Sequence, residues 1–259
     1  MNFSHLEERE ASEIRAFLND LINGIENPWY KKEQKIQKER FFVTILWVVQ
    51  SIREQDAKNV LVIGPDGPID WCINKLGLLK NTNFSYTEFD LRYPFIFDDN
   101  HFDFIINTEV LEHIKDVDGS RRDIFNFSGV NSFLSECSRV LKSEKQMFLT
   151  TPNSCSIGAV CRVILHQGAI SYKGHVREYS VVELDEVLNA AHFKTAYRTT
   201  IDTFRISIFE DESLHEDDPS FAAFVNSYRA VYNDVLNKKL FDDHEFRGDQ
   251  IFCLAQNAK

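Results

Sequence analysis

Short apolar segments alternate with helix-like stretches from residue 59 onward. Segments of this length, bounded by turn residues, are typical of buried strands, and the stretches between them are typical of crossover helices. The pattern therefore predicts an α/β fold built on a mostly parallel sheet flanked by helices. The six segments are NVLVIG (59–64), SYTEFDL (85–91), FDFIINT (102–108), QMFLTTPN (146–153), FKTAYRTT (193–200) and QIFCLAQN (250–257).

The first part of the chain has a different pattern. Apolar residues recur at helical spacing over residues 4–56, and NPWY at 27–30 interrupts them, which predicts two helices. We therefore divide the chain into an N-terminal helical cap, residues 1–56, and a second domain, residues 57–259.

Two connections between the predicted strands have features of their own. The apolar side chains of residues 129–143 fall on one helical stripe, which predicts a crossover helix. Residues 154–174 are unusually apolar for a connection, and we interpret them as a lid over the site. A plain surface helix packed on the core is the alternative.

Composition and charge narrow the class of protein. The 259 residues include 29 Lys and Arg against 40 Asp and Glu, a formal net charge of −11. This charge opposes binding to polyanions such as nucleic acid or acidic lipid surfaces, and a small neutral or cationic partner fits better. The apolar run FFVTILWVV at 41–49 is far shorter than the roughly 20 residues that cross a membrane.

The N-terminus and the cysteines bear on the compartment. The first residues are charged and lack the apolar core of a secretion signal, so a cytoplasmic protein is expected. The five cysteines form no CxxC pair, and we expect reduced, mostly buried thiols. Nothing in the sequence indicates an oligomeric state.

The turn after the first predicted strand is the first candidate binding site. In open parallel sheets the ligand crevice lies at the carboxyl ends of the strands. Gly64 and Gly67 would allow a ligand to approach the backbone closely. However, GPDGP at 64–68 matches neither GxGxxG nor GxxxxGK[ST], so neither familiar phosphate cradle is expected. A purely structural turn remains the alternative.

Three further blocks carry a resemblance to a known family. They are HFDFIINTEVLEHIKD (101–116), FLSECSRVLKSEKQMFLTTPN (133–153) and HVREYSVVELDEVLNAAHFK (175–194). In this order and spacing the chain resembles, over roughly residues 58–200, the class I S-adenosylmethionine-dependent methyltransferases, in particular the FD…EVLEH group similar to methyltransferase types 11 and 12.

The resemblance implies a fold and an activity. The fold is a Rossmann-like, mostly parallel sheet flanked by helices, the class I methyltransferase fold, here with an N-terminal helical cap. The cofactor is S-adenosylmethionine, and the reaction transfers its methyl group to an oxygen or nitrogen atom of an acceptor. We expect a small molecule or a glycan precursor as the acceptor.

The resemblance also implies which residues bind the cofactor. They are Gly64, Pro65, Asp66, Gly67, Asp90, Asn107, Thr108 and Glu109. Asp90 would contact the ribose hydroxyls or lie beside the adenine, while an aspartate that caps a turn is the alternative. The chain departs from the family where Val62 replaces the usual acidic residue at the end of the first strand.

Candidate catalytic groups follow the third strand. Glu109, Glu112 and His113 are spaced i, i+3 and i+4, so a helix beginning near Glu109 would place them on one face. The resemblance to metal-dependent members implies a divalent metal held by Glu109, Glu112, His113 and His175. In the alternative, Glu112 and His113 only pack the helix, or His113 or His175 acts as a general base, with Glu109 at the catalytic mouth.

The block around His175 allows two interpretations. Arg177 and Tyr179 are candidates to orient the acceptor. Ser180 and Glu183 have the spacing of a capping box, which predicts that a helix begins at residue 181.

Two competing functions remain. A non-catalytic scaffold that kept the fold but lost cofactor binding is favoured by Val62 and the altered glycine loop. A nicotinamide-dependent oxidoreductase is disfavoured because the chain lacks the GxGxxG loop.

Overall fold

The computed structural model describes residues 8–64, 67–116, 128–166, 168, 170–210, 219–237 and 247–259. One six-stranded sheet runs through it in the order β2-β1-β3-β4-β6-β5. Each of the six predicted segments contributes a strand, and β6 is antiparallel to both of its neighbours while the other pairs are parallel. The strands are β1 Asn59–Ile63, β2 Asn83–Tyr86, β3 Phe102–Thr108, β4 Leu141–Pro152, β5 Phe193–Ile201 and β6 Gln250–Asn257.

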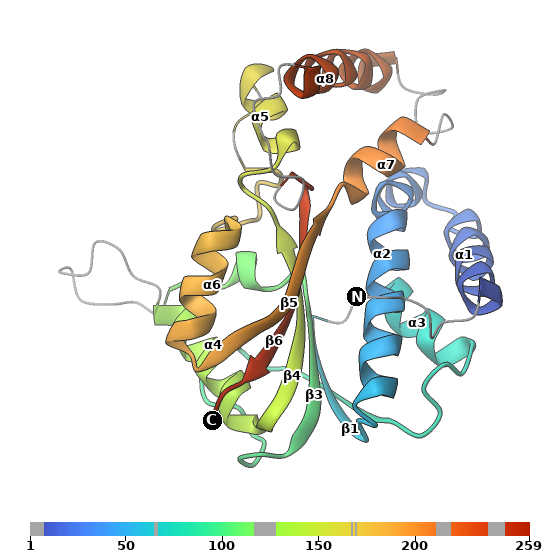
Figure 1. The fold of residues 1–259 in the computed structure, drawn as a ribbon. Coiled ribbons are helices and arrows are strands. Elements are labelled where there is room, and N and C mark those ends of the chain that lie inside the picture. Colours follow the sequence, from blue (N-terminus) through green and yellow to red (C-terminus); the bar gives the residue numbers. More distant parts are fainter. Residues whose placement is uncertain are drawn as a thin grey trace.

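Helices cover both faces of the sheet, which makes the fold a Rossmann-like sandwich of three layers (Figure 1). On one face lie α1 (Glu8–Asn23), α2 (Pro28–Glu54) and α3 (Gly67–Lys75). On the other face lie α4 (Ser128–Val140) and α6 (Val181–Ala190). Strand β3, in the middle of the sheet, is buried along its whole length, as expected for a strand covered on both faces.

The predicted break between the two N-terminal helices is confirmed. Asn27 caps α2 by accepting a hydrogen bond from the amide of Tyr30, and Pro28 occupies the first turn, where its missing N–H costs nothing. Farther along α2, Trp47 packs against Phe148 and Phe252 of the sheet. Helix α2 therefore belongs to the hydrophobic core, and a domain boundary at residue 56 stays a prediction.

The two helices on the opposite face also agree with the sequence. The stripe predicted within residues 129–143 is buried along α4 and the start of β4. Ser180 and Glu183 form the predicted capping box: the Ser180 hydroxyl accepts from the Glu183 amide over 3.2 Å, and Glu183 Oε2 accepts from the Ser180 amide over 2.9 Å.

Three helices lie beyond the end of the sheet at which β4 and β5 finish (Figure 1). They are α5 (Ile157–Ile164), α7 (Thr203–Glu210) and α8 (Pro219–Asn237). Buried side chains from all three, including Cys161, Ile208 and Tyr228, form a separate small core. This layer therefore stands at the carboxyl ends of the parallel strands, where a binding crevice is expected.

Two further expectations can be compared with the structure. All five cysteines are free, and Cys155 is exposed while the other four are buried, as expected for reduced thiols. Among the helices of the described ranges, none is long and apolar enough to cross a membrane.

Candidate active site at the carboxyl edge of the sheet

The turn after β1 packs closely on the end of β3. Gly64 has φ +69°, and a Cβ atom built on it would lie 2.1 Å from Val110 Cγ2 and 3.0 Å from the carbonyl oxygen of Thr108. The Thr108 hydroxyl donates a hydrogen bond of 3.2 Å to the Gly64 carbonyl oxygen. Glycine is therefore required at position 64 by the fold itself.

The other residues of this turn differ from Gly64. Gly67 is the first residue of α3, and a Cβ atom on it would meet nothing within 4 Å. The candidates Pro65 and Asp66 lie outside the described residues. Val62, which stands in place of the usual acidic residue, is buried in the core.

Strand β2 ends at Tyr86, whereas the sequence predicted a strand that reaches residue 91. Asp90 therefore lies in the connection, four residues after the strand. Its carboxylate accepts a hydrogen bond from the Arg92 amide and forms an ion pair of 2.6 Å with the Arg92 guanidinium. These hydrogen bonds lower the pKa of Asp90 to about 2. Asp90 thus takes the turn-capping role weighed as its alternative, and a cofactor contact stays a prediction.

At the end of β3 two polar side chains are held in unusual ways. Asn107 has no exposed surface, and within the described part of the chain neither polar atom of its side chain has a hydrogen-bond partner. Glu109 has φ +55°, a strained conformation for a residue other than glycine. The Thr150 hydroxyl donates to Glu109 Oε1 over 2.8 Å, and Gln250 donates to the same oxygen.

The helix expected to begin near Glu109 is not formed, and this prediction is wrong. A single 3₁₀ turn, η1 (Leu111–His113), replaces it. The carbonyl oxygen of Glu112 accepts hydrogen bonds from the amides of Val176, over 2.7 Å, and Arg177, over 3.3 Å. That carbonyl would have to accept from residue 116 in an α-helix, so the distant segment around residue 176 takes the place of the next helical turn.

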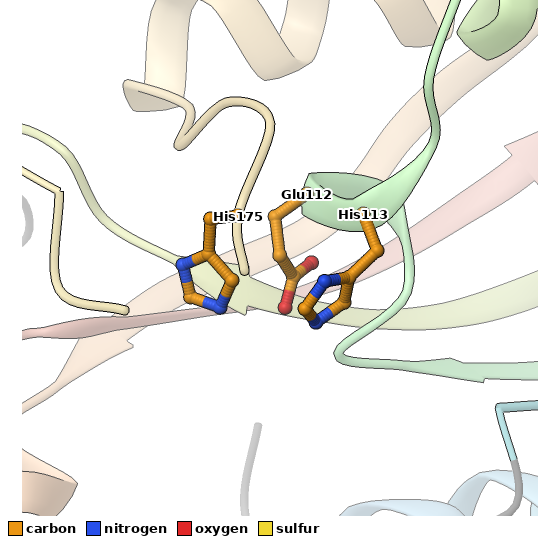
Figure 2. A group of neighbouring side chains, drawn as sticks. All are labelled: Glu112, His113 and His175. Atoms are coloured by element: carbon orange, nitrogen blue, oxygen red, sulfur yellow. The ribbon is translucent and has the colours of Figure 1, made fainter. Parts of the chain in front are cut away.

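The same turn brings Glu112, His113 and His175 together. One ligand atom from each of these side chains lies within 4.8 Å of those of the other two. Figure 2 shows the Glu112 carboxylate among the two imidazole rings, whose centroids are 4.9 Å apart. Glu109, the fourth candidate ligand, is not part of this cluster.

Hydrogen bonds fix the orientation of both rings. Nδ1 of His113 lies 3.1 Å from the carbonyl oxygen of Gly174, and Nδ1 of His175 lies 2.7 Å from Oε1 of Glu178. Because both partners are acceptors, each neutral ring carries its proton on Nδ1 and its lone pair on Nε2. Metal-binding histidines are held in this way by carbonyl or carboxylate groups.

Glu112 carries the unusual electrostatics of the cluster. Its side chain is fully buried, Oε2 accepts from the Thr151 hydroxyl over 3.0 Å, and Oε1 has no partner within the described residues. Burial raises the pKa of Glu112 well above its ordinary value, and the nearby charge of Glu109 raises it further. A cation bound between Glu112 and the two histidines would satisfy the free oxygen and offset the cost of burial.

A cavity of about 540 Å³ opens beside this cluster. Glu109, Glu112, His113 and His175 line it on the side of the sheet. Helices supply much of the remaining wall: Gln34, Gln37 and Arg40 of α2, Phe204 of α7 and Phe224 of α8. The cavity therefore combines ionisable groups on one side with amide, guanidinium and aromatic side chains on the other.

Sequence patterns did not identify some residues of the site, and they assigned one core residue, Tyr179, to the acceptor. Tyr179, a candidate to orient the acceptor, is buried in the core, and this burial raises its pKa. Glu178 was missed, although its i+3 spacing from His175 was a usable signal. The polar residues of α2 gave no signal, because only the packing of α2 brings them to the cavity.

The strand order, with one reversed strand beside the last edge strand, agrees with the Rossmann-like class I methyltransferase fold that the sequence resemblance implies. No protein-family model matches the sequence, and no curated protein sequence matches it.

Solved structures give matches of low similarity. A candidate sarcosine dimethylglycine methyltransferase from Galdieria sulphuraria is 14% identical with a TM-score of 0.49, covering 83% of this chain and 86% of that chain. A SAM-dependent methyltransferase from Archaeoglobus fulgidus is 12% identical with a TM-score of 0.46, and the match covers 82% of this chain and 94% of that chain. A Haemonchus contortus phosphoethanolamine N-methyltransferase bound to S-adenosylmethionine is 13% identical with a TM-score of 0.45, and the match covers 78% of this chain and 49% of that chain. These similarities are too low to carry an argument about activity, so function must be inferred from the residues of the site.

Proposed function

We propose that this protein is an S-adenosylmethionine-dependent methyltransferase that methylates an oxygen or nitrogen atom of a small molecule or glycan precursor. The observation that carries the proposal is the cavity at the carboxyl edge of the sheet, lined by Glu109, Glu112, His113 and His175. Ligands of open α/β sheets bind at this edge. The sequence blocks that resemble the methyltransferase family supply the strands and turns around it.

The proposed cofactor site lies around the ends of β1 and β3. Gly67 faces open space and would let the methionine part of the cofactor approach the backbone, whereas at Gly64 the Val110 side chain would have to move aside. The buried, unpartnered amide of Asn107 offers a donor and an acceptor. Thr108 and Glu109 follow on the same strand end. Asp90 is the candidate for the ribose or adenine, and would have to exchange part of its bonding to Arg92.

The proposed reaction is an in-line attack by the acceptor atom on the methyl group of the sulfonium. The carbon–sulfur bond breaks, its electron pair stays on sulfur, and the product is a neutral thioether. Since the donor is already reactive, the protein mainly aligns the two substrates and excludes water. In the metal-free form of the mechanism, Nε2 of His113 or His175 accepts the acceptor's proton.

The finer proposal is a divalent metal held by Glu112, His113 and His175, with Glu109 beside them. The unpartnered Glu112 oxygen and the two Nε2 lone pairs fit such an ion. When bound, the metal would polarise an acceptor hydroxyl and lower its pKa. The Gly174 carbonyl and the Glu178 carboxylate would hold the two histidine ligands in place through Nδ1. Glu109 would line the cavity beside them, where it could contact the acceptor.

Calorimetry with S-adenosylmethionine tests the main proposal. Binding by the wild type is expected, and Asn107→Ala should weaken it about tenfold, the loss of one or two net hydrogen bonds. Asn189→Ala, at an exposed position of α6, is the matched control and should bind as the wild type does. No binding at millimolar cofactor would instead favour the non-catalytic scaffold, an alternative supported by Val62 and by the Val110 side chain packed on Gly64.

Equilibrium dialysis followed by metal analysis tests the finer proposal. The wild type should retain a divalent ion after dialysis, and the double variant Glu112→Ala/His113→Ala should not. Equal metal content in the two proteins would overturn the metal site and leave the methyltransferase proposal intact.

A further inference from the structure

Glu178 is a buried carboxylate directly behind His175. Its side chain is 2% exposed, and Oε1 accepts three hydrogen bonds: from the Ser171 amide over 2.6 Å, from the Ser171 hydroxyl, and from Nδ1 of His175 over 2.7 Å. Nη2 of Arg162, on α5, lies 3.7 Å from the other oxygen. A carboxylate taken out of water needs such partners, so the position of Glu178 is closely determined.

The hydrogen bond to Glu178 decides which nitrogen of the neutral His175 ring carries the proton. A carboxylate can only accept, and therefore Nδ1 of a neutral His175 must donate. Nε2 is left as the acceptor, on the part of the ring nearest Glu112 and His113 (Figure 2). The Ser171 hydroxyl oxygen lies 3.5 Å from Nδ1 of His175, but a hydroxyl can donate as well as accept, so it fits either tautomer and does not select this one.

We propose that Glu178 is a positioning residue that holds His175 in the tautomer whose Nε2 lone pair faces the cavity. The amide and the hydroxyl of Ser171 both donate to Glu178, and these hydrogen bonds tie the two ends of segment 171–178 together behind the ring. The use of Nε2, as a metal ligand or as a proton acceptor, rests on the proposed function. The tautomer itself does not.

The competing interpretation is structural: Glu178 would only tie residues 171–178 to α5 through Arg162. In that case removing Glu178 would lower stability and leave the His175 tautomer unchanged. The tautomer is therefore the measurement that separates the two roles.

Nitrogen-15 NMR of the imidazole side chains in the metal-free full-length protein reads the tautomer, at about pH 8, where an ordinary histidine is neutral. His175→Gln identifies the His175 signals. The wild type is expected to carry the proton on Nδ1. Glu178→Met should shift His175 toward the Nε2–H form, whereas Glu178→Gln, whose side-chain oxygen can replace Oε1, should keep the wild-type tautomer.

Two NMR results would overturn the proposal: an Nε2–H tautomer in the wild type, or an unchanged tautomer in a folded Glu178→Met variant. The wild-type measurement does not depend on removing Glu178, so an Nε2–H result there overturns the proposal even if Glu178→Met does not fold. Glu186→Gln, which removes an exposed carboxylate from α6, is the charge-matched control and should change nothing.

Zinc affinity gives a second readout. Glu178→Met should bind Zn²⁺ about 10–100-fold more weakly than the wild type, as for other outer partners of metal-bound histidines. Unchanged affinity in that variant would overturn a role for Glu178 in presenting Nε2. A wild type that binds no Zn²⁺ would instead remove the metal from the proposed function, and the tautomer measurement would still decide the role of Glu178.

Discussion

The hydroxyl of Thr151 donates a hydrogen bond of 3.0 Å to Oε2 of Glu112, and neither side chain is exposed to solvent. Thr151 lies on β4 and Glu112 in η1, so this bond anchors the 3₁₀ turn to the sheet. It is also the one side-chain hydrogen bond that Glu112 makes among the described residues.

Thr151→Val should therefore destabilise the protein without changing the size of the side chain. A buried group that loses its partner costs about 1–3 kcal/mol, and we expect the free energy of unfolding to fall by that amount in urea denaturation. Thr151→Ser restores the hydroxyl and should lie within about 1 kcal/mol of the wild type. Equal stability of the valine variant and the wild type would show that the bond does not anchor the turn.

The two glycines of the first turn should respond differently to the same substitution. Gly64→Ala should lower the free energy of unfolding by about 2–4 kcal/mol, since the new Cβ would overlap Val110 at a positive φ. Gly67→Ala meets open space and should change stability by less than about 1 kcal/mol. Urea denaturation of both variants checks this, and similar losses at the two positions would contradict it.

Gly67→Ala also separates fold from binding. Because stability should be unaffected, any loss of S-adenosylmethionine affinity in calorimetry would come from contact between this position and the cofactor. Unchanged affinity would place the cofactor away from Gly67.

The features that could be predicted from the sequence are those decided by local interactions. The strands could be located because each is a short apolar run bounded by turn residues. The start of α2 at Asn27 and Pro28 and the capping box of Ser180 and Glu183 depend on hydrogen bonds within four residues, so their spacing alone was informative.

The features that could not be predicted depend on contacts between distant segments. A helix from Glu109 was a reasonable expectation from spacing, but the amide of Val176 occupies the Glu112 carbonyl that such a helix would need. The sequence could bring Glu112 and His175 into one hypothesis only through a family resemblance. It could not indicate that α2 supplies Arg40 and Gln37 to the cavity, since that depends on how the helix packs.

The carboxylate of Asp249 should give stability a distinct pH dependence. It accepts hydrogen bonds from the Thr203 amide and hydroxyl and from the amides of Phe204 and Arg205, and so caps α7. Burial, together with the charge of Asp202, raises the pKa of Asp249 to about 7. A folded pKa above the unfolded one means that stability is full at acid pH and is lost as the pH rises to about 7.

Melting temperatures between pH 5 and about 8 test this dependence. Between pH 5 and about 7 the wild type should lose up to about 3 kcal/mol of stability through this group, with no further loss at higher pH, while Asp249→Asn, which cannot titrate, should lack that component. Asp249→Asn should also be less stable throughout, because its amide nitrogen cannot accept the α7 amides. Parallel curves for the two proteins would mean that the capping donors keep Asp249 ionised over the whole range.

The ligand set of the proposed metal site should discriminate between ions. Two imidazole nitrogens and one carboxylate suit Zn²⁺ or Mn²⁺, whereas Mg²⁺ prefers an octahedron of oxygen ligands. We expect Zn²⁺ to bind the metal-free protein at least about tenfold more tightly than Mg²⁺ in competition titrations. His113→Ala should remove this preference, and His166→Ala, at an exposed position away from the cavity, should retain it. Preference for Mg²⁺ in the wild type would show that oxygen atoms dominate the site, with Glu109 and Glu112 as the ligands in place of the histidines.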